Sequence, residues 1–209
     1  VHTITANGDV TNTRALRKIG DSSIKFDGTG DYLTVLPADS SDWDFTGDFT
    51  IEGWLYSTTT SGSQTMFDTG SITFKLSGGS WWLGVSGMSP AELYYVSETI
   101  GTNTWKHIAV VRSGTTVTCY IEGVATAFNA TADTGTISGT ISGTGMSIGA
   151  LIDGSYPMTG YVDEFRVSDS ARYTGNFTPS TTAFTADSNT LLLIHSNWDG
   201  GLGADSSGN

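Results

Sequence analysis

Short runs in which apolar and polar residues alternate recur along almost the entire chain. In the clearest run, Phe49–Tyr56, the apolar residues Phe49, Ile51 and Leu55 fall on one face of an extended backbone. Clusters of Gly, Ser, Thr and Asp separate the runs, and these residues favour turns. About a dozen strands without a convincing helix predict an all-β fold in which two antiparallel sheets pack face to face.

The expected strands are short and are bounded by turn-forming residues. They are Ser22–Phe26, Asp31–Val35, Phe49–Tyr56, Thr65–Asp68, Ile72–Leu76, Trp81–Val85, Leu93–Val96, His107–Arg112, Val117–Glu122, Met146–Ile148, Tyr161–Val167 and Thr190–Ile194. One further segment, Asp169–Tyr173, predicts a single helical turn.

The two ends of the chain match each other as parts of one structural element. The C-terminal end holds an apolar stretch, Thr190–Ile194, followed by the turn-forming residues Asp205–Asn209, and a Thr-rich alternating stretch occupies residues 1–10. These pieces predict one hairpin that is divided between the ends. We expect residues 1–209 to form a single domain, which is one slice of a tandem array or is closed by strands from both ends.

A formal net charge of −12 bears on the partners that the chain can take. Binding to a phosphate backbone depends on Lys and Arg, so nucleic acid is not expected as a partner. Cys119 is the only cysteine, which excludes a disulfide within the chain and a cysteine-based zinc site. The sequence holds no long apolar run, so insertion into a membrane is not expected either.

A series of short motifs occurs in the order found in a known family. The motifs are Ser23–Gly28, Asp31–Leu33, Gly47–Trp54, Trp105–Arg112, Tyr120–Gly123, Ser147–Gly149, Gly160–Ser168, Ala171–Tyr173 and Phe177–Pro179. Together they resemble the laminin G-like domain of the concanavalin A-like lectin/glucanase superfamily. The resemblance implies a two-sheet jelly-roll sandwich, in most members a non-catalytic module that binds glycans or proteins. It also implies that residues 187–209 supply the Leu-rich strand that other members have at the N-terminus.

The same resemblance implies a structural Ca²⁺ ion that ties an early strand to a late one, with Asp27, Gly28 and Asp163 as the residues at the ion. The turn Asp27–Asp31 offers two carboxylates and glycine carbonyls, which are oxygen ligands that calcium prefers. The alternative is that Asp27 and Asp31 only cap the turn by hydrogen bonds to its backbone. Both interpretations stay open at this point.

The positions of the carboxylates in the sequence give little support to hydrolysis of glycans. Retaining glycosidases need two carboxylates about 5–5.5 Å apart, and related enzymes place them at alternate positions of one strand. Glu52 stands alone in its strand, and the adjacent Asp163 and Glu164 should point to opposite faces of theirs. Only a Glu52–Glu164 pair across the sheet would remain, so no enzymatic activity is expected.

Glycan binding needs an exposed aromatic face with polar groups beside it. Trp81 and Trp82 are adjacent in an expected strand, so one ring should pack in the core and the other should be exposed. The alternative is that the rings are core residues, as expected for Trp54 and Trp105. The candidate ligand-binding aromatics are Trp43, Trp81, Trp82, Tyr94, Tyr95 and Tyr156.

These observations predict a non-catalytic module that binds a glycan or a protein surface, on an extracellular, cell-surface or virion protein. A neighbouring copy of the same module is a further candidate partner. The alternatives are a structural spacer in a fibre or adhesin and, with less support, a glycan hydrolase or lyase.

Overall fold

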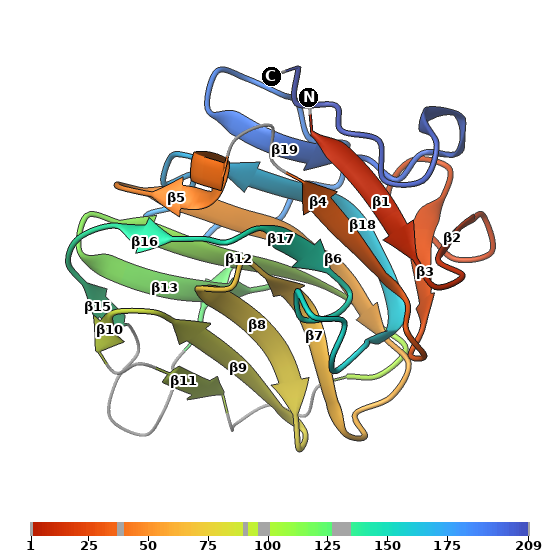
Figure 1. The fold of residues 1–209 in the computed structure, drawn as a ribbon, viewed down its shortest axis with the longest axis horizontal. Coiled ribbons are helices and arrows are strands. Elements are labelled where there is room, and N and C mark those ends of the chain that lie inside the picture. The colour runs from red at the N-terminus through yellow and green to blue at the C-terminus, as the bar shows by residue number, and fades with distance from the viewer. Residues whose placement is uncertain (1, 37–39, 90–91, 96–100, 127–134, 209) are drawn as a thin grey trace.

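The computed structural model describes residues 2–36, 40–89, 92–95, 101–126 and 135–208. Two large antiparallel sheets pack against each other, and a small two-stranded sheet lies beside them (Figure 1). The predicted all-β, antiparallel sandwich is therefore confirmed. Each expected strand overlaps an observed one, although Val96 lies outside the described residues. Among the described residues, no helix has the length and apolar character needed to cross a membrane.

The first large sheet contains seven strands and shows clean alternation. In spatial order they are β1 (Thr3–Asn7), β4 (Tyr32–Leu36), β17 (Met146–Ile148), β7 (Ser63–Asp68), β8 (Ile72–Ser77), β9 (Ser80–Val85) and β11 (Glu92–Tyr95). In β8 and β9, fully buried residues alternate with half-buried ones. One face of this sheet therefore packs into the core and the other faces outward.

The second large sheet contains ten strands. In spatial order, its main path contains β10 (Met88–Ser89), β15 (Gly135–Ile137), β13 (Thr116–Ile121), β12 (Trp105–Ser113), β6 (Phe49–Ser57), β18 (Thr159–Ser168), β3 (Ser23–Asp27) and β2 (Thr11–Thr13). Two strands lie off this path: β14 (Val124–Ala125) pairs with β13, and β19 (Thr190–Ile194) pairs with β18. The small sheet pairs β5 (Asp44–Phe45) with β16 (Ile141–Ser142). Two short 3-10 helices, η1 (Ser40–Trp43) and η2 (Trp198–Gly200), complete the described elements.

The central strands β6 and β18 are buried on both faces, which strand alternation alone does not predict. Their inner residues, such as Ile51 and Phe165, belong to the single hydrophobic core between the sheets. On the outer face, Tyr173 and Phe177 of the segment 169–189 pack against a small apolar cluster on β12 and β13. The segment therefore covers the part of the sheet that would otherwise be open to solvent.

The expected helical turn at Asp169–Tyr173 is wrong. The Thr50 hydroxyl of β6 donates a hydrogen bond to the Ser170 carbonyl at 2.7 Å and accepts one from the Arg172 N–H at 3.0 Å. The backbone of this segment therefore bonds to the sheet beneath it, and the described residues there have no helical conformation.

The two ends of the chain lie side by side but belong to different sheets (Figure 1). The prediction that Thr190–Ile194 is ordered within a sheet is confirmed. The prediction of one hairpin from both ends is wrong, because Leu192 and Ile194 enter the core beside β18, whereas β1 pairs with β4. The ends are joined instead by His2, whose backbone N–H donates to Asp205 Oδ2 at 2.8 Å.

Candidate functional site

The adjacent tryptophans of β9 divide between core and surface as alternation predicts. Trp81 is 4% exposed and stacks on Phe74 in the core, so its candidate role in ligand binding is wrong. Trp82 is half-buried on the outer face, with the Lys75 ammonium 5.1 Å from its ring centre. Trp43 is completely buried beside the His2 ring, and its candidate role is wrong as well, because η1 turns the indole into the core.

The candidate tyrosines are not gathered in one place. Tyr156 is exposed, and its carbonyl accepts the Thr65 N–H at 2.9 Å. The backbone of β11 places Tyr94 opposite Trp82 in the seven-stranded sheet. The side chains of Tyr94 and Tyr95 lie outside the described part of the structure.

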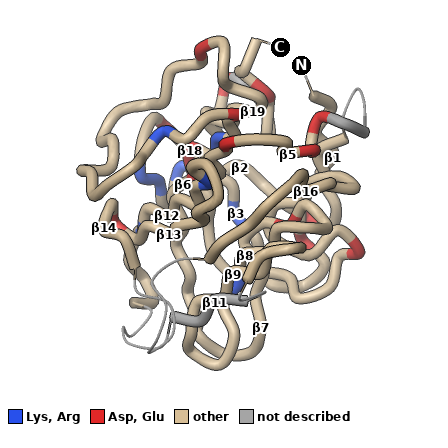
Figure 2. Tube along the Cα trace, turned by 90° about the vertical axis from the view of Figure 1, so that its left-hand side faces the viewer, with Lys and Arg blue, Asp and Glu red and all other residues tan. Residues whose placement is uncertain are grey.

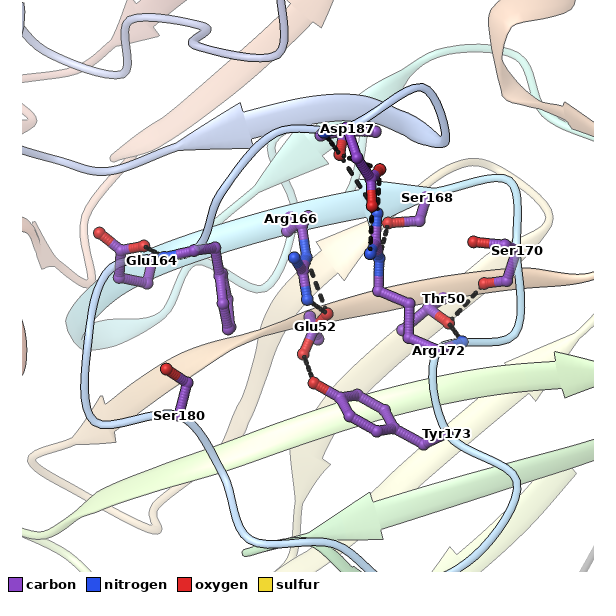
Figure 3. Close-up of polar contacts among 12 residues, drawn as sticks. Thr50, Glu52, Glu164, Arg166, Ser168, Ser170, Arg172, Tyr173, Ser180 and Asp187 are labelled. Atoms are coloured by element: carbon purple, nitrogen blue, oxygen red, sulfur yellow. Dashed lines mark hydrogen bonds and ion pairs between the residues drawn. The ribbon is translucent and has the colours of Figure 1, made fainter.

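Glu52 forms a buried ionic network on the outer face of β6 (Figure 3). Arg166 donates two hydrogen bonds to Glu52 Oε1, at 2.9 Å from Nε and at 2.6 Å from an Nη atom, and the Tyr173 hydroxyl donates to Oε2 at 2.8 Å. His107 Nε2 lies 3.3 Å from Oε2 without hydrogen-bond geometry. Burial alone would raise the pKa of Glu52, but His107 and Arg166 outweigh it and hold the pKa below its ordinary value.

A β-bulge in β18 changes where the next carboxylates point. The register against β6 shifts between Asp163 and Arg166, and Glu164 within this bulge has φ of 49°. Glu164 is fully buried, accepts the Phe184 N–H at 2.8 Å and lies 2.9 Å from His195 Nδ1. The hydrogen bond to Glu164 raises the pKa of His195. Glu52 and Glu164 are thus both engaged in contacts inside the protein, each with its own set of partners.

Asp163 binds a neighbouring loop from the same outer face. Its Oδ2 accepts the N–H groups of Lys18 at 2.8 Å and Ile19 at 3.0 Å, while its buried Oδ1 has no hydrogen-bond partner among the described residues. Burial raises the pKa of Asp163 to about 7, and the charge of Glu164 adds to this. The prediction that Asp163 and Glu164 point to opposite faces is wrong, because it assumes a strand without a bulge.

Three carboxylates meet at the turn after β3. One oxygen from each of Asp9, Asp27 and Asp31 lies within 4.8 Å of the others. The buried Asp31 accepts the N–H groups of Asp9 at 2.8 Å and Asp27 at 2.9 Å, and Asp27 accepts the Thr29 N–H at 2.6 Å. Asp27 and Asp31 therefore do cap the turn, and these hydrogen bonds leave the calcium prediction untested. Burial raises the pKa of Asp31, and the charge of Asp27 adds to this.

Asp163 does not join these carboxylates. The register of β3 against β18 places Thr159 opposite Asp27, so Asp163 lies four residues further along, about 13 Å at the usual rise of a strand. Its carboxylate is also occupied by the loop at Lys18. The expected ligand set of Asp27, Gly28 and Asp163 is therefore wrong as a set, and Asp9 takes the place expected for Asp163.

Calcium at the cluster of Asp9, Asp27 and Asp31 stays a prediction. We expect added CaCl₂ to raise the melting temperature, because an ion that binds only the folded chain stabilises it by about 2.7 kcal/mol at 100 times its Kd. Thermal unfolding with CaCl₂ and with EGTA measures the effect. Asp27→Asn should remove the response, whereas Asp153→Asn in another exposed turn should keep it. Equal melting temperatures of the wild-type chain in both buffers would contradict the prediction.

A hollow of about 210 Å³ opens beside β19, and polar and apolar atoms share its lining about equally. The lining residues are His195, Ser196, Asn197, Gly201, Ala204 and Ser206. Ser196 has φ of 59° and is 3% exposed. Its buried hydroxyl has no hydrogen-bond partner among the described residues. A strained backbone with an unused buried hydroxyl is typical of a site that receives a ligand or an ordered water.

Trp198 follows the lining residue Asn197 in the chain, and it is not itself among the residues that line the hollow. It is 48% exposed, one of the few large hydrophobic side chains on the described surface. The Arg14 guanidinium lies 4.8 Å from the centre of its ring, over one face. Polar lining groups and an exposed aromatic ring are therefore neighbours in this part of the chain.

The loop before β3 holds the hollow in place. The Ser22 hydroxyl donates to the Ser196 carbonyl at 2.5 Å, and the Trp198 N–H donates to Asp21 Oδ1 at 3.0 Å. Gly20, with φ of 66°, approaches Asn197 so closely that a Cβ would lie 2.2 Å from its Oδ1. Trp198 was not among the sequence candidates, although it lies among loop-forming residues, as the candidate Trp43 does.

A second hollow of about 360 Å³ has a different character. It is lined by Asp42, Asp44, Phe45, Thr46, Gly47, Asp48, Asp169 and Leu191. Its aromatic residue, Phe45, is 3% exposed, and Asp48 already accepts the Gly114 N–H at 2.7 Å. The exposed Trp198 adjoins the first hollow in the chain, whereas Trp43, which adjoins the second, is buried, so the hollow beside β19 is the better candidate for a ligand site.

Comparisons with known proteins agree with this fold. A family model, Laminin_G_3, described as the concanavalin A-like lectin/glucanases superfamily, matches residues 27–175. None of the curated proteins matches the sequence significantly.

Three solved structures illustrate the structural similarity. A protein from Bacteroides ovatus ATCC 8483, provisionally assigned as carbohydrate-binding, is 18% identical with a TM-score of 0.63, over 82% of this chain and 50% of its own. The binding domain of botulinum neurotoxin DC is 11% identical with a TM-score of 0.59 in its complex with SialylT, and 10% identical with a TM-score of 0.60 in its complex with rat synaptotagmin II. Both complexes match 82% of this chain and 44% of theirs, so the chain spans about half the length of the solved chains it matches. Such identities show the shared fold alone.

Proposed function

Because this chain belongs to the concanavalin A-like lectin/glucanases superfamily through its Laminin_G_3 region, we propose that it is a glycan-binding module whose saccharide occupies the hollow at Trp198. The single observation that carries the proposal is the half-exposed indole of Trp198 next in the chain to Asn197, one of the four polar residues that line the hollow. An aromatic ring offers its face to the C–H side of a sugar, and the lining groups can bond to sugar hydroxyls. The volume of about 210 Å³ is below the roughly 300–1,000 Å³ of pockets for drug-sized ligands, so it suits one sugar ring.

A glycan is favoured over a protein surface as the ligand. Protein interfaces have an apolar core, usually built around clustered aromatic residues. The exposed large hydrophobic residues of the described chain are Leu36, Val124, Tyr156 and Trp198, which lie in separate parts of the sequence and of the fold. A single exposed ring beside polar groups suits a sugar better than such an interface.

The structural neighbours are consistent with a binding module, since a provisional carbohydrate-binding protein and toxin binding domains share the fold. One of the neurotoxin complexes contains SialylT and the other contains synaptotagmin. We place the module on an extracellular or cell-surface protein, where glycans are presented. Two further roles of the module stay predictions: that it serves as a structural spacer, and that it contacts a neighbouring copy of itself.

Truncation of Trp198 tests the proposal. We expect Trp198→Ala to weaken glycan binding about tenfold or more, because removal of a central aromatic residue often costs about 2 kcal/mol and about 1.4 kcal/mol is a tenfold change. A glycan array identifies a ligand for the wild-type chain, and calorimetry then gives the Kd of each variant. Unchanged melting temperature shows that the variant is folded.

Trp82→Ala is the matched control, since Trp82 is a half-buried tryptophan on the other large sheet with a cation over its ring. It should bind as the wild-type chain does. Loss of binding in Trp82→Ala with retention in Trp198→Ala would move the site to the seven-stranded sheet. Binding to no glycan on the array would refute the proposed function.

A further inference from the structure

Among the described residues that line the hollow beside β19, His195 is the only ionisable one. Its Nδ1 lies 2.9 Å and 3.0 Å from the two carboxylate oxygens of Glu164, which is fully buried, while 24% of the His195 side chain is exposed. No described residue bonds to the other ring nitrogen, Nε2, and Nε2 is not one of the buried polar atoms that lack a partner. Nε2 is therefore the polar atom that this ring offers to the hollow.

The backbone is strained at two positions that adjoin this ring. Glu164, with φ of 49°, and Ser196, with φ of 59°, are two of the five described residues other than glycine that have a positive φ. Ser196 follows His195 in the chain and carries the buried hydroxyl that has no partner among the described residues. Backbone strain of this kind persists where the surrounding structure holds it, which is often at a ligand site. The ion pair and the hollow thus share one strained part of the fold.

The bond to Glu164 decides what Nε2 can do in each protonation state. A carboxylate only accepts hydrogen bonds, so Nδ1 keeps its proton and the neutral ring has a lone pair at Nε2. In the protonated ring, Nε2 carries an N–H and donates a charge-assisted bond, which is stronger than a bond between neutral groups. A sugar hydroxyl can bond to either form, and its bond to the protonated form is the stronger one.

The charged groups around His195 act on its pKa to different extents. The elements packed around it carry Asp163, Glu164 and Arg166 on β18, Arg14, Lys18 and Asp21 in the loop before β3, Asp199 and Asp205 after β19, and Arg172 and Asp187 in the segment 169–189. Glu164 is the main cause of the raised pKa of His195, burial opposes it, and the charge of Asp163 adds to it. Figure 2 shows Asp and Glu positions in many loops of the chain, and exposed carboxylates ordinarily titrate at about pH 4. A change in binding above pH 5.5 therefore points to a histidine or to Asp163, whose pKa is about 7.

We infer that the saccharide in the hollow accepts a hydrogen bond from Nε2 of the protonated His195, and that loss of this proton weakens its binding. The inference rests on the proposed function, because it names a contact and a pH control of that same site. His195 lies outside residues 27–175, so the family match does not account for this control.

Glycan binding at two pH values tests the inference. An array of neutral oligosaccharides that end in galactose, glucose, mannose, fucose or N-acetylglucosamine is read at pH 5.5 and pH 8.5, and calorimetry then gives the Kd for the glycan that binds most strongly. Neutral glycans are used because the attraction of an anionic glycan would change with the net charge of the chain. We expect binding to be about fivefold weaker at pH 8.5, since a charge-assisted hydrogen bond is replaced by a neutral one.

Four variants assign the pH dependence to a residue. His195→Gln cannot ionise and should bind equally at both pH values, with the weaker Kd. Glu164→Gln keeps an oxygen for the Phe184 N–H but removes the charge that raises the pKa of His195, so affinity should fall at lower pH than in the wild-type chain. His2→Gln and Asp163→Asn, which remove other groups that titrate near neutral pH, should keep most of the difference. Melting temperatures show that each variant is folded.

Nitrogen-15 NMR of the histidine rings gives a second readout in the wild-type chain. The bound glycan should raise the pKa of His195 by the logarithm of the same factor, because the coupling between proton and glycan is reciprocal. Equal wild-type binding at both pH values, or an unchanged pKa with the glycan bound, would overturn the inference and leave glycan binding in place. So would a pH dependence that survives in His195→Gln or disappears in Asp163→Asn. Binding to no glycan at either pH would refute the proposed function, and the inference would fall with it.

Discussion

Arg166→Met should lower the free energy of unfolding by about 3–5 kcal/mol, the usual cost of removing one partner of a buried ion pair. Arg166 supplies two of the hydrogen bonds that hold the Glu52 carboxylate, which is 1% exposed. The methionine side chain retains the apolar stem that packs beside Phe184, so the change removes mainly the charge. Glu52 is then left with the Tyr173 hydroxyl and the nearby His107 ring as its polar neighbours.

Urea unfolding at pH 7 of the single and double variants measures this cost. Glu52→Gln/Arg166→Met should recover most of the lost stability, since the neutral amide needs no cation. Tyr173→Phe, which removes one hydrogen bond from the same carboxylate, should cost only about 1–2 kcal/mol. A single variant Arg166→Met as stable as the wild-type chain would show that the network does not stabilise the fold. The double variant guards against a general packing defect, because it carries the same methionine.

The strands could be predicted from the sequence because alternation is a local signal. Ile72–Leu76 and Trp81–Val85 alternate along the chain, and the residues that alternate inward are the ones that enter the core. The predicted fold class needed only this pattern and the order of the family motifs. The covering segment 169–189 was not predictable in this way, because its hydrogen bonds go to Thr50, a residue more than 100 positions away.

The candidate site was less predictable, because it depends on distortions and long-range contacts. Trp43 lies in a stretch that favours loops, yet it is buried, since a 3-10 turn directs its ring inward. The bulge at Glu164 reverses the expected direction of one carboxylate, and period-two reasoning cannot locate a bulge. The hollow at Trp198 needs residues 20–22 and 195–206 together, and no local pattern brings these segments side by side.

Asp163→Asn should make the chain more stable than the wild type at pH 8 and remove a pH dependence that the wild type has. A folded-state pKa of about 7, above the ordinary value of 3.8, means that the folded chain binds the proton more tightly than the unfolded chain does. The resulting stabilisation is fully present below about pH 4 and is lost as the pH rises towards and through about 7. The difference in pKa corresponds to about 4 kcal/mol across this range.

The asparagine keeps an oxygen that can accept the N–H groups of Lys18 and Ile19, and it cannot ionise, so the loop stays bound without a buried charge. Urea midpoints at pH 5, 6, 7 and 8 give the difference between variant and wild type at each pH. His195, whose pKa is also raised, loses stabilisation only above about pH 6.5; Glu164 is the main cause of the raised pKa and is present in both chains, and the charge of Asp163 is the smallest cause, so most of this effect cancels in the difference. The difference should therefore grow in favour of the variant from pH 5 to pH 8, whereas the exposed Asp153→Asn should show no such trend. A constant difference for Asp163→Asn would mean that the carboxylate titrates alike in the folded and unfolded chains, and burial would then not be what sets its pKa.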